Sequence, residues 1–244
     1  MRVHLFVPCY VDQFFPAVGI ATLRLLERLG CEVTYPAGQT CCGQPMANSG
    51  AEHASVGTYL NYVEQFGDAE YVVCPSGSCV HHVREHYDVL EQTPAVRRVR
   101  ARTYELCEFI VDVLGDPLIE GHFPHRVGLH QSCHGLRGLR LASDSERNDE
   151  PFDKIRRVLR GVRGLELVDL IRRDECCGFG GTFAVAQEAL SVRMGQDRLA
   201  DHLQAGAEYI ASADMSCLMH LGGLARRRGA PVEMRHVAQL IAGE

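Results

Sequence analysis

Cysteine is the residue type best able to do chemistry in this sequence, because 11 thiols occur among its 244 residues. Eight of them follow one order twice: a single cysteine, then Cys-Cys-Gly, then Ser-Cys. The two sets are Cys9, Cys41, Cys42 and Cys79, and Cys133, Cys176, Cys177 and Cys217. A shuffled chain of this composition would contain roughly 0.05 Cys-Cys-Gly triplets, so two triplets with similar flanks indicate an internal duplication.

The adjacent cysteines favour a multi-iron cluster over a single ion in each set. Two neighbouring cysteines cannot easily direct both sulfurs at one ion unless the backbone is distorted. A cluster offers several iron sites close together, so it can bind both sulfurs. The glycine after each pair, Gly43 or Gly178, allows the tight turn that this needs. Zinc sites usually use Cys-x₂₋₄-Cys spacing, which only Cys74 and Cys79 approach in this sequence. We therefore expect the eight thiols to be metal ligands, with zinc binding and dithiol redox chemistry as alternatives.

The remaining cysteines and two histidines have simpler interpretations. Cys31, Cys74 and Cys107 are expected to be small buried core residues, although Cys74 could supply a fifth sulfur in the first half. His82 and His220 each stand three residues after a cysteine of the sets. Packing is their simpler role, and a hydrogen bond to a cluster sulfur is the alternative.

Alternating strands and helices must position these thiols. Expected strands cover 3–7, 32–35, 70–74, 126–130, 165–170 and 208–211. Expected helices cover 16–29, 51–66, 78–90, 183–203, 217–227 and 236–242, and 94–114 is expected to be helical with room for a strand in its middle. Strands that alternate with helices form parallel sheets, and ligands gather beyond the carboxyl ends of such strands. Because several of the repeated cysteines follow strands, we expect each set to converge at one sheet edge.

The expected fold class is α/β, with two tandem, internally duplicated domains, each a mostly parallel sheet flanked by helices. A stretch containing glycine and proline at 115–124 separates the halves, so the expected domains are 1–117 and 124–244. Near the end of each half, the sequence pairs Glu105-Leu106 with Glu233-Met234, and an apolar helical pattern follows both.

Charge and hydropathy exclude several other classes of protein. The net charge is −6, and neither half has the strong basic excess of a nucleic-acid binder. No apolar run reaches the roughly 18 residues of a membrane span, and the apolar start of the chain is too short for a secretory signal. Many thiols in a reducing compartment indicate metal binding or redox chemistry. We expect a cytoplasmic protein without a membrane span.

Four stretches around the cysteines carry a family resemblance. They are Pro-Ser-Gly-Ser-Cys at 75–79, Ser-Cys-His-Gly-Leu-Arg at 132–137, Asp-Glu-Cys-Cys-Gly-Phe-Gly-Gly-Thr-Phe at 174–183, and Ala-Asp-Met-Ser-Cys-Leu-Met-His at 213–220. With them, essentially the whole chain resembles the CCG cysteine-rich domain family. That family includes a component of heterodisulfide reductase, the glycolate oxidase iron–sulfur subunit and the lactate utilisation protein A and YkgE-type proteins, which the chain resembles most.

The resemblance implies an iron–sulfur electron-transfer subunit of a complex that oxidises L-lactate to pyruvate. The eight cysteines would hold one or two clusters, and the implied partners are a ferredoxin-type iron–sulfur subunit and a third lactate-utilisation subunit. Many members close each motif with Cys-x-x-Cys, but this chain has Ser76 and Asp214 in place of the first of those cysteines. Four thiols per half suit a [4Fe–4S] cluster. A zinc-binding scaffold of a redox complex and a dithiol/disulfide oxidoreductase are the alternatives.

Overall fold

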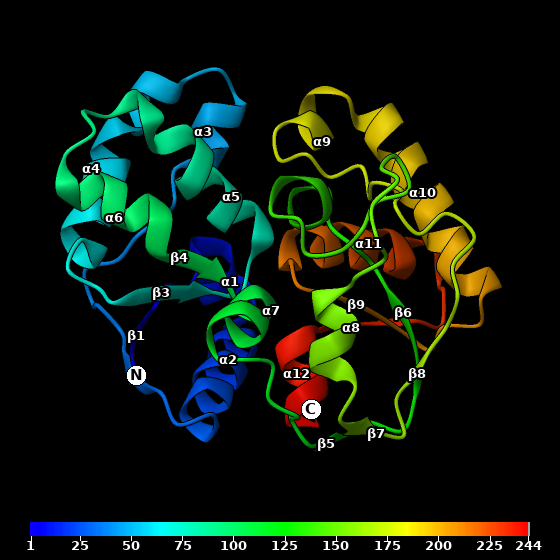
Figure 1. The fold of residues 1–244 in the computed structure, drawn as a ribbon. Coiled ribbons are helices and arrows are strands. Elements are labelled where there is room, and N and C mark those ends of the chain that lie inside the picture. The colour runs from blue at the N-terminus through cyan, green and yellow to red at the C-terminus, as the bar shows by residue number, and fades with distance from the viewer. Residues whose placement is uncertain (244) are drawn as a thin grey trace. The chain divides into compact units, whose positions relative to one another are not determined.

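Two compact units make up the chain in the computed structural model, which describes residues 1–243. The first unit is Met1–Phe109, and the second runs from Ile110 to the end of the described chain. In each unit helices flank a parallel sheet (Figure 1). The α/β class with two similar tandem domains is therefore confirmed. The limits 1–117 and 124–244 stay a prediction.

The sheet of the first unit is parallel throughout, in the order β2-β1-β3-β4. Its strands are β1 (Arg2–Leu5), β2 (Glu32–Thr34), β3 (Tyr71–Cys74) and β4 (Thr103–Glu105). Val3 on the central strand β1 pairs with Val33 on one side and Tyr71 on the other. The strands expected at 3–7, 32–35 and 70–74 are thus present, with ends that differ by one or two residues.

The helices of the first unit occupy the connections between these strands. They are α1 (Cys9–Phe14), α2 (Pro16–Arg28), α3 (Gln44–Asn48), η1 (Glu52–Ser55), α4 (Val56–Phe66), α5 (Gly77–His86), η2 (Tyr87–Val89), α6 (Pro94–Arg102) and α7 (Leu106–Glu108), and η3 (Phe109–Val113) follows α7. The helical segment expected at 94–114 contains strand β4 in its middle, as the sequence allowed. The short helices α1 and α3 were not predicted, because neither is long enough to show a helical period.

The second unit has the same sheet, in the order β10-β9-β6-β8 and again parallel. Its strands are β6 (Arg126–Leu129), β8 (Glu166–Leu167), β9 (Tyr209–Ser212) and β10 (Glu233–His236), and β5 (Gly121–His122) pairs with β7 (Val162–Arg163). Its helices are η4 (His134–Gly138), α8 (Lys154–Leu159), α9 (Phe183–Ala186), α10 (Glu188–Gln204), α11 (Met215–Arg228) and α12 (Val237–Ala242). The equal strand order supports the duplication inferred from the cysteines.

Strand register corrects one pairing between the halves. Cys74, five residues before Cys79, pairs with Glu105, whereas Ser212, five residues before Cys217, pairs with His236. Glu105 and His236 each begin a capping box at the following helix. The structural equivalent of Glu105 is therefore His236, and the sequence pairing with Glu233 was wrong by three residues.

Aromatic side chains pack together in the core of the first unit. Phe6, Tyr62 and Phe66 are all buried, with ring centroids 4.9 Å apart for Phe6 and Tyr62 and 4.5 Å apart for Tyr62 and Phe66. Over the described residues 1–243, none of the helices is both long and apolar enough to cross a membrane.

Candidate metal centres

The carboxyl ends of β1 and β3 place two thiols of the first set. Cys9 is the first residue of α1, and Cys79 lies in the first turn of α5. Ser76 caps α5, because its side chain accepts a hydrogen bond from the Cys79 amide at 3.4 Å. The serine at this position therefore fixes the backbone that carries Cys79.

The loop before α3 brings the adjacent thiols to the same place. Cys9 Sγ lies 3.4 Å from Cys41 Sγ. Hydrogen bonds between thiols continue the series from Cys41 to Cys42 and from Cys42 to Cys79. Cys42 and Cys79 are 2% and 4% exposed, and the other two are half-buried. All four cysteines predicted for the first half thus meet in one cluster of sulfurs, which we call the first sulfur set.

Cys41 is the thiol of the first sulfur set whose pKa is lowered. Hydrogen bonds from Cys42 and Cys9 lower the pKa of Cys41 to about 3, and the Gly43 amide, 3.3 Å from Cys41 Sγ, adds to this. The pKa of Cys9 is raised by its bond to Cys41 and by burial. The pKa of Cys42 is raised by its bonds to Cys41 and Cys79 and by burial. Cys9 and Cys42 favour the protonated form because a second adjacent negative charge is unfavourable without a cation.

The second unit repeats this arrangement. Cys133 follows β6 at the start of η4, the Cys176–Cys177 pair lies in the loop before α9, and Cys217 lies in the first turn of α11. Hydrogen bonds from Cys133 and Cys177 lower the pKa of Cys176 to about 2. The pKa of Cys177 is raised by its bonds to Cys176 and Cys217 and by burial. We call these four cysteines the second sulfur set.

Capping and glycine conformation also match between the two sets. Asp214 caps α11 by accepting a hydrogen bond from the Ser216 amide at 3.1 Å, as Ser76 caps α5. Gly43 and Gly178 have φ values of 89° and 85°, in the left-handed region that favours glycine. The Gly178 amide lies 3.3 Å from Cys176 Sγ. Each set therefore has its own glycine turn and its own capped helix.

The donor atoms of each set fit a soft metal centre. In each set four thiols form a series of sulfur–sulfur contacts, and the pKa is lowered for one of them, Cys41 or Cys176, and raised for its two neighbours. Thiolates are the ligands of iron–sulfur clusters and of structural zinc, and a bound cationic centre would remove the repulsion that keeps the other thiols protonated. The chemistry of the residues therefore suits such a group in both units.

The other cysteines noted in the sequence are buried, and the two histidines have hydrogen-bond partners. Cys31, Cys74 and Cys107 are buried, and Cys74 Sγ donates a weak hydrogen bond to the Ser76 carbonyl at 3.8 Å. His82 Nε2 lies 3.0 Å from the Tyr59 hydroxyl, and His220 Nε2 lies 3.3 Å from the Ser191 carbonyl oxygen. Packing is thus the role that these contacts support for the two histidines.

Sequence reasoning missed a buried charged group beside the second sulfur set. His130, the residue that follows β6, has a ring nitrogen within 4.8 Å of the sulfurs of Cys177 and Cys217. Arg198 of α10 is 0% exposed, donates from Nε to His130 Nδ1 at 3.2 Å, and pairs with Asp201 at 3.1 Å. Burial, followed by the charge of Arg198, lowers the pKa of His130 to about 3. The ring is therefore neutral at physiological pH.

His202 makes the stability of the second unit sensitive to acid. Burial and the charge of Arg198 lower its pKa to about 2, below the ordinary value of about 6.5 in an unfolded chain. The fold therefore favours the neutral ring. The contribution of His202 to the free energy of unfolding is present above pH 6.5 and is lost as the pH falls toward 2. In that range the free energy of unfolding falls with a limiting slope of about 1.4 kcal/mol per pH unit.

We expect the free energy of unfolding to fall less steeply below pH 6.5 in His202→Leu than in the unchanged protein. Urea unfolding followed by circular dichroism from pH 8 to pH 5 measures both slopes. Parallel curves for the two proteins would contradict the assignment.

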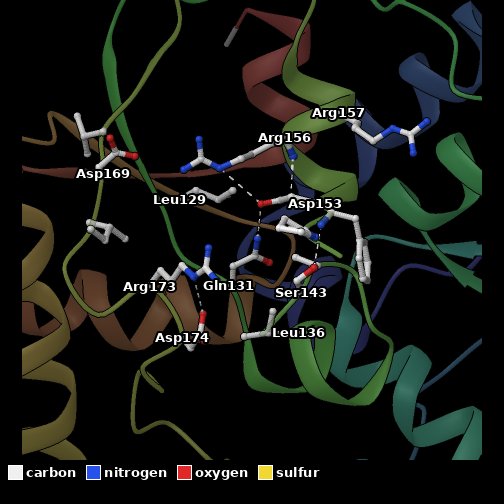
Figure 2. A pocket seen from close by; sticks show the side chains of 15 residues that line it. Leu129, Gln131, Leu136, Ser143, Asp153, Arg156, Arg157, Asp169, Arg173 and Asp174 are labelled. Atoms are coloured by element: carbon white, nitrogen blue, oxygen red, sulfur yellow. Dashed lines mark hydrogen bonds and ion pairs between the residues drawn. The ribbon is translucent and has the colours of Figure 1, made fainter. Parts of the chain in front are cut away.

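A cavity of ≈ 640 Å³ opens in the second unit, and two of its lining residues, Gln131 and Asp174, each stand two residues before a cysteine of the second sulfur set (Figure 2). Its lining combines an apolar floor with three arginines and three aspartates. Inside it, Gln131 donates from Nε2 to Asp153 Oδ2 at 2.9 Å, and Arg156 Nε lies 3.5 Å from the same carboxylate. Burial raises the pKa of Asp153. The charges balance, so the cavity has no strong preference for one sign of ligand.

Comparison with a protein-family model agrees with this geometry. The model of the CCG family, described as a cysteine-rich domain, matches residues 3–84 and 127–222. The two matches span the first and second sulfur sets respectively. Each therefore contains four of the thiols that the structure brings together.

Relatives match along the whole length of the chain. Proteins named lactate utilization protein A are 40% identical to it in Bacillus subtilis, over 99% of both chains, and 40% identical in Halalkalibacterium halodurans, over 99% of this chain and 96% of the relative. The Exiguobacterium protein of that name is 41% identical over 98% and 96%. A hypothetical protein from Helicobacter pylori shares the fold at a TM-score of 0.63 and 10% identity, over 99% of this chain and 48% of that one.

Proposed function

This chain belongs to the CCG cysteine-rich domain family and, within it, to the lactate utilization protein A group, and from that premise we propose that it is an iron–sulfur electron-transfer subunit of a complex that oxidises L-lactate to pyruvate. Relatives of about 40% identity carry a name that refers to lactate utilisation. The single observation that supports the chemistry is the convergence of eight thiols in two sets of four.

Each sulfur set would hold one [4Fe–4S] cluster. The ligands are Cys9, Cys41, Cys42 and Cys79 in the first unit, and Cys133, Cys176, Cys177 and Cys217 in the second. Such a cluster takes up and releases single electrons at a potential that its surroundings set. The protein's part is to keep four sulfurs at one sheet edge, to bury Cys42 and Cys177, and to leave Cys9 and Cys133 half-exposed toward solvent.

We propose that the complex contains two further subunits. One is a ferredoxin-type iron–sulfur protein that exchanges electrons with this chain, and the other is a third lactate-utilisation protein. The reducing cytoplasm is the proposed location, because thiols remain available there for cluster assembly. Half-exposed sulfurs in both sets support exchange with a partner, since electron transfer between proteins needs the centres close to the surface.

Zinc and disulfide chemistry are the competing functions of the same sulfurs. The triad of His130, Cys177 and Cys217 resembles a zinc donor set in composition. However, the Arg198 hydrogen bond already occupies the lone pair of His130 Nδ1. A disulfide between Cys41 and Cys42, or between Cys176 and Cys177, would close a strained ring between neighbours in the chain. A disulfide uses only two sulfurs of a set, and a single zinc ion would need both adjacent sulfurs to point at one ion, whereas a cluster offers a separate iron to each sulfur.

Metal analysis of protein purified without oxygen tests this proposal. We expect iron and acid-labile sulfide in equal amounts, about four of each per occupied set, broad visible absorption, and an electron paramagnetic resonance signal after reduction. One zinc per set would contradict the cluster and support the scaffold function. Metal-free protein with exchangeable thiols under the same conditions would support the dithiol function.

In the assembled complex, L-lactate should bleach the visible absorption, and a complex left unchanged by L-lactate would contradict the substrate.

A further inference from the structure

The two sulfur sets differ most at one equivalent position. Phe6 and His130 each stand three residues before the first cysteine of their set. Phe6 donates its backbone amide to the Val73 carbonyl at 3.0 Å, and His130 donates its amide to the equivalent Ala211 carbonyl at 2.7 Å. The backbones therefore match. The side chains do not, because the first unit has an apolar ring packed on Tyr62, whereas the second has an imidazole.

Arg198 fixes which nitrogen of His130 carries the proton. A guanidinium is protonated at every physiological pH and has only donors. Its Nε lies 3.2 Å from His130 Nδ1, so Nδ1 must be the acceptor and must lack a hydrogen. The proton of the neutral ring is then on Nε2. Arg198 cannot readily turn away, because its guanidinium also pairs with Asp201 Oδ2 at 3.1 Å and bonds the Arg172 carbonyl.

The remaining nitrogen of His130 has no partner of its own among residues 1–243. His130 Nε2 is buried and makes no hydrogen bond there, although an unsatisfied buried N–H is unfavourable. The sulfurs of Cys177 and Cys217 lie within 4.8 Å of the ring's ligand atom. A sulfur-rich group bound by these cysteines would supply the missing acceptor.

We propose that His130 donates a hydrogen bond from Nε2 to a sulfur of the cluster in the second sulfur set, and that this bond gives the second cluster the more positive reduction potential of the two. The inference rests on the proposed function, because it needs a cluster in each set. Hydrogen bonds to cluster sulfurs raise the potential, since they stabilise the added negative charge of the reduced state. The first set has Phe6 at this position and receives no such bond from it.

The same geometry argues against His130 as a metal ligand. A ligand nitrogen needs a lone pair, but Nε2 carries the hydrogen whenever Nδ1 accepts from Arg198. Arg198 is therefore a positioning residue, which acts on the cluster through the tautomer of His130. Its position in the core of the second unit, paired with Asp201, is what keeps that tautomer in place.

Two chains with one cluster each test the potentials without altering His130. Cys177→Ser would retain the first cluster alone, and Cys42→Ser the second alone. After anaerobic reconstitution and an iron count, a redox titration followed by electron paramagnetic resonance should give a higher midpoint for the Cys42→Ser chain. Equal midpoints, or a lower one for the second cluster, would overturn the inference.

Variants of His130 in the Cys42→Ser background test the hydrogen bond itself. His130→Asn can offer its amide oxygen to Arg198 but is too short to replace the Nε2 donor. We expect the ratio of reduced to oxidised cluster at a fixed potential to fall about tenfold, which is a shift of about 59 mV for one electron. His130→Gln, which extends an N–H donor about as far as Nε2, should recover part of that shift. His202→Leu removes another buried histidine of the second unit and should leave the midpoint unchanged.

The outcomes separate this inference from the function on which it rests. Chains that carry iron and sulfide but show the same midpoint in His130→Asn as with His130 present would overturn the inference alone. Chains that bind no iron under anaerobic conditions would overturn the proposed function, and the hydrogen bond with it. A midpoint shift in His202→Leu equal to that in His130→Asn would also overturn the assignment to Nε2.

Discussion

Replacing Cys177 with serine is expected to remove about half of the iron from each chain, because one cluster of two is lost. Cys177 is 3% exposed and hydrogen-bonds both Cys176 and Cys217, so it lies in the middle of the second sulfur set. Iron in such clusters prefers thiolate ligands, so a serine hydroxyl would bind it poorly. Cys42→Ser should have the same effect in the first unit, and the double variant should bind no iron.

Iron and acid-labile sulfide per chain, after anaerobic reconstitution, measure this effect. The matched control is Cys31→Ser, because Cys31 is also a buried cysteine of the first unit but is not in a sulfur set. The control should keep its full iron content. Full iron content in Cys177→Ser, or the same loss in the control, would show that the convergence of thiols is structural rather than metal-binding.

The turn after each cysteine pair should tolerate no side chain. Gly43 has a φ of 89°, and a Cβ on it would lie 2.3 Å from Tyr59 Cε1, a ring packed on Tyr87 in the core. Strain from the left-handed backbone and overpacking each cost about 1–3 kcal/mol. We therefore expect Gly43→Ala to lower the free energy of unfolding by about 3 kcal/mol or more and to weaken cluster retention in the first unit.

Gly50→Ala separates the clash from the backbone strain. Gly50 has a φ of 80°, and a Cβ there would meet no atom within 4 Å. Its replacement should cost only the strain, about 1 kcal/mol, and should leave the iron content intact. Urea unfolding of the two variants under identical anaerobic conditions gives the comparison. Equal losses of stability would contradict the close packing of Gly43 against Tyr59.

The repeated thiols were enough to predict most of the architecture. Cysteines that follow apolar segments such as 3–7 and 126–130 indicate the carboxyl ends of parallel strands, and the structure has parallel strands there. The glycine after each pair indicates a special turn, and both Gly43 and Gly178 have positive φ. These features depend on local sequence. For this reason the sequence of this one chain was sufficient to predict them.

The group formed by His130 and Arg198 could not be predicted, because it depends on long-range packing. The two residues are far apart in the sequence, and α10 must fold back over β6 before they meet. Composition also argues against them, since arginine is almost never fully buried without a partner. The shift from Glu233 to His236 was hidden for a similar reason: strand register, rather than residue similarity, determines which positions are equivalent.

Under the proposed function, folding would precede metal delivery, because the cysteines of each sulfur set come from distant segments of the chain. Cys9 and Cys79 come together only after β1 and β3 have paired, with the Cys41–Cys42 loop added from a third region of the chain. An assembly factor would therefore have to recognise a finished domain and enter beside the half-exposed Cys9 and Cys41. Once inserted, the cluster would cross-link residues 9 and 79 and close a long loop, a constraint that disfavours unfolding. Depletion of iron during synthesis should thus yield a folded precursor of lower stability rather than a misfolded chain.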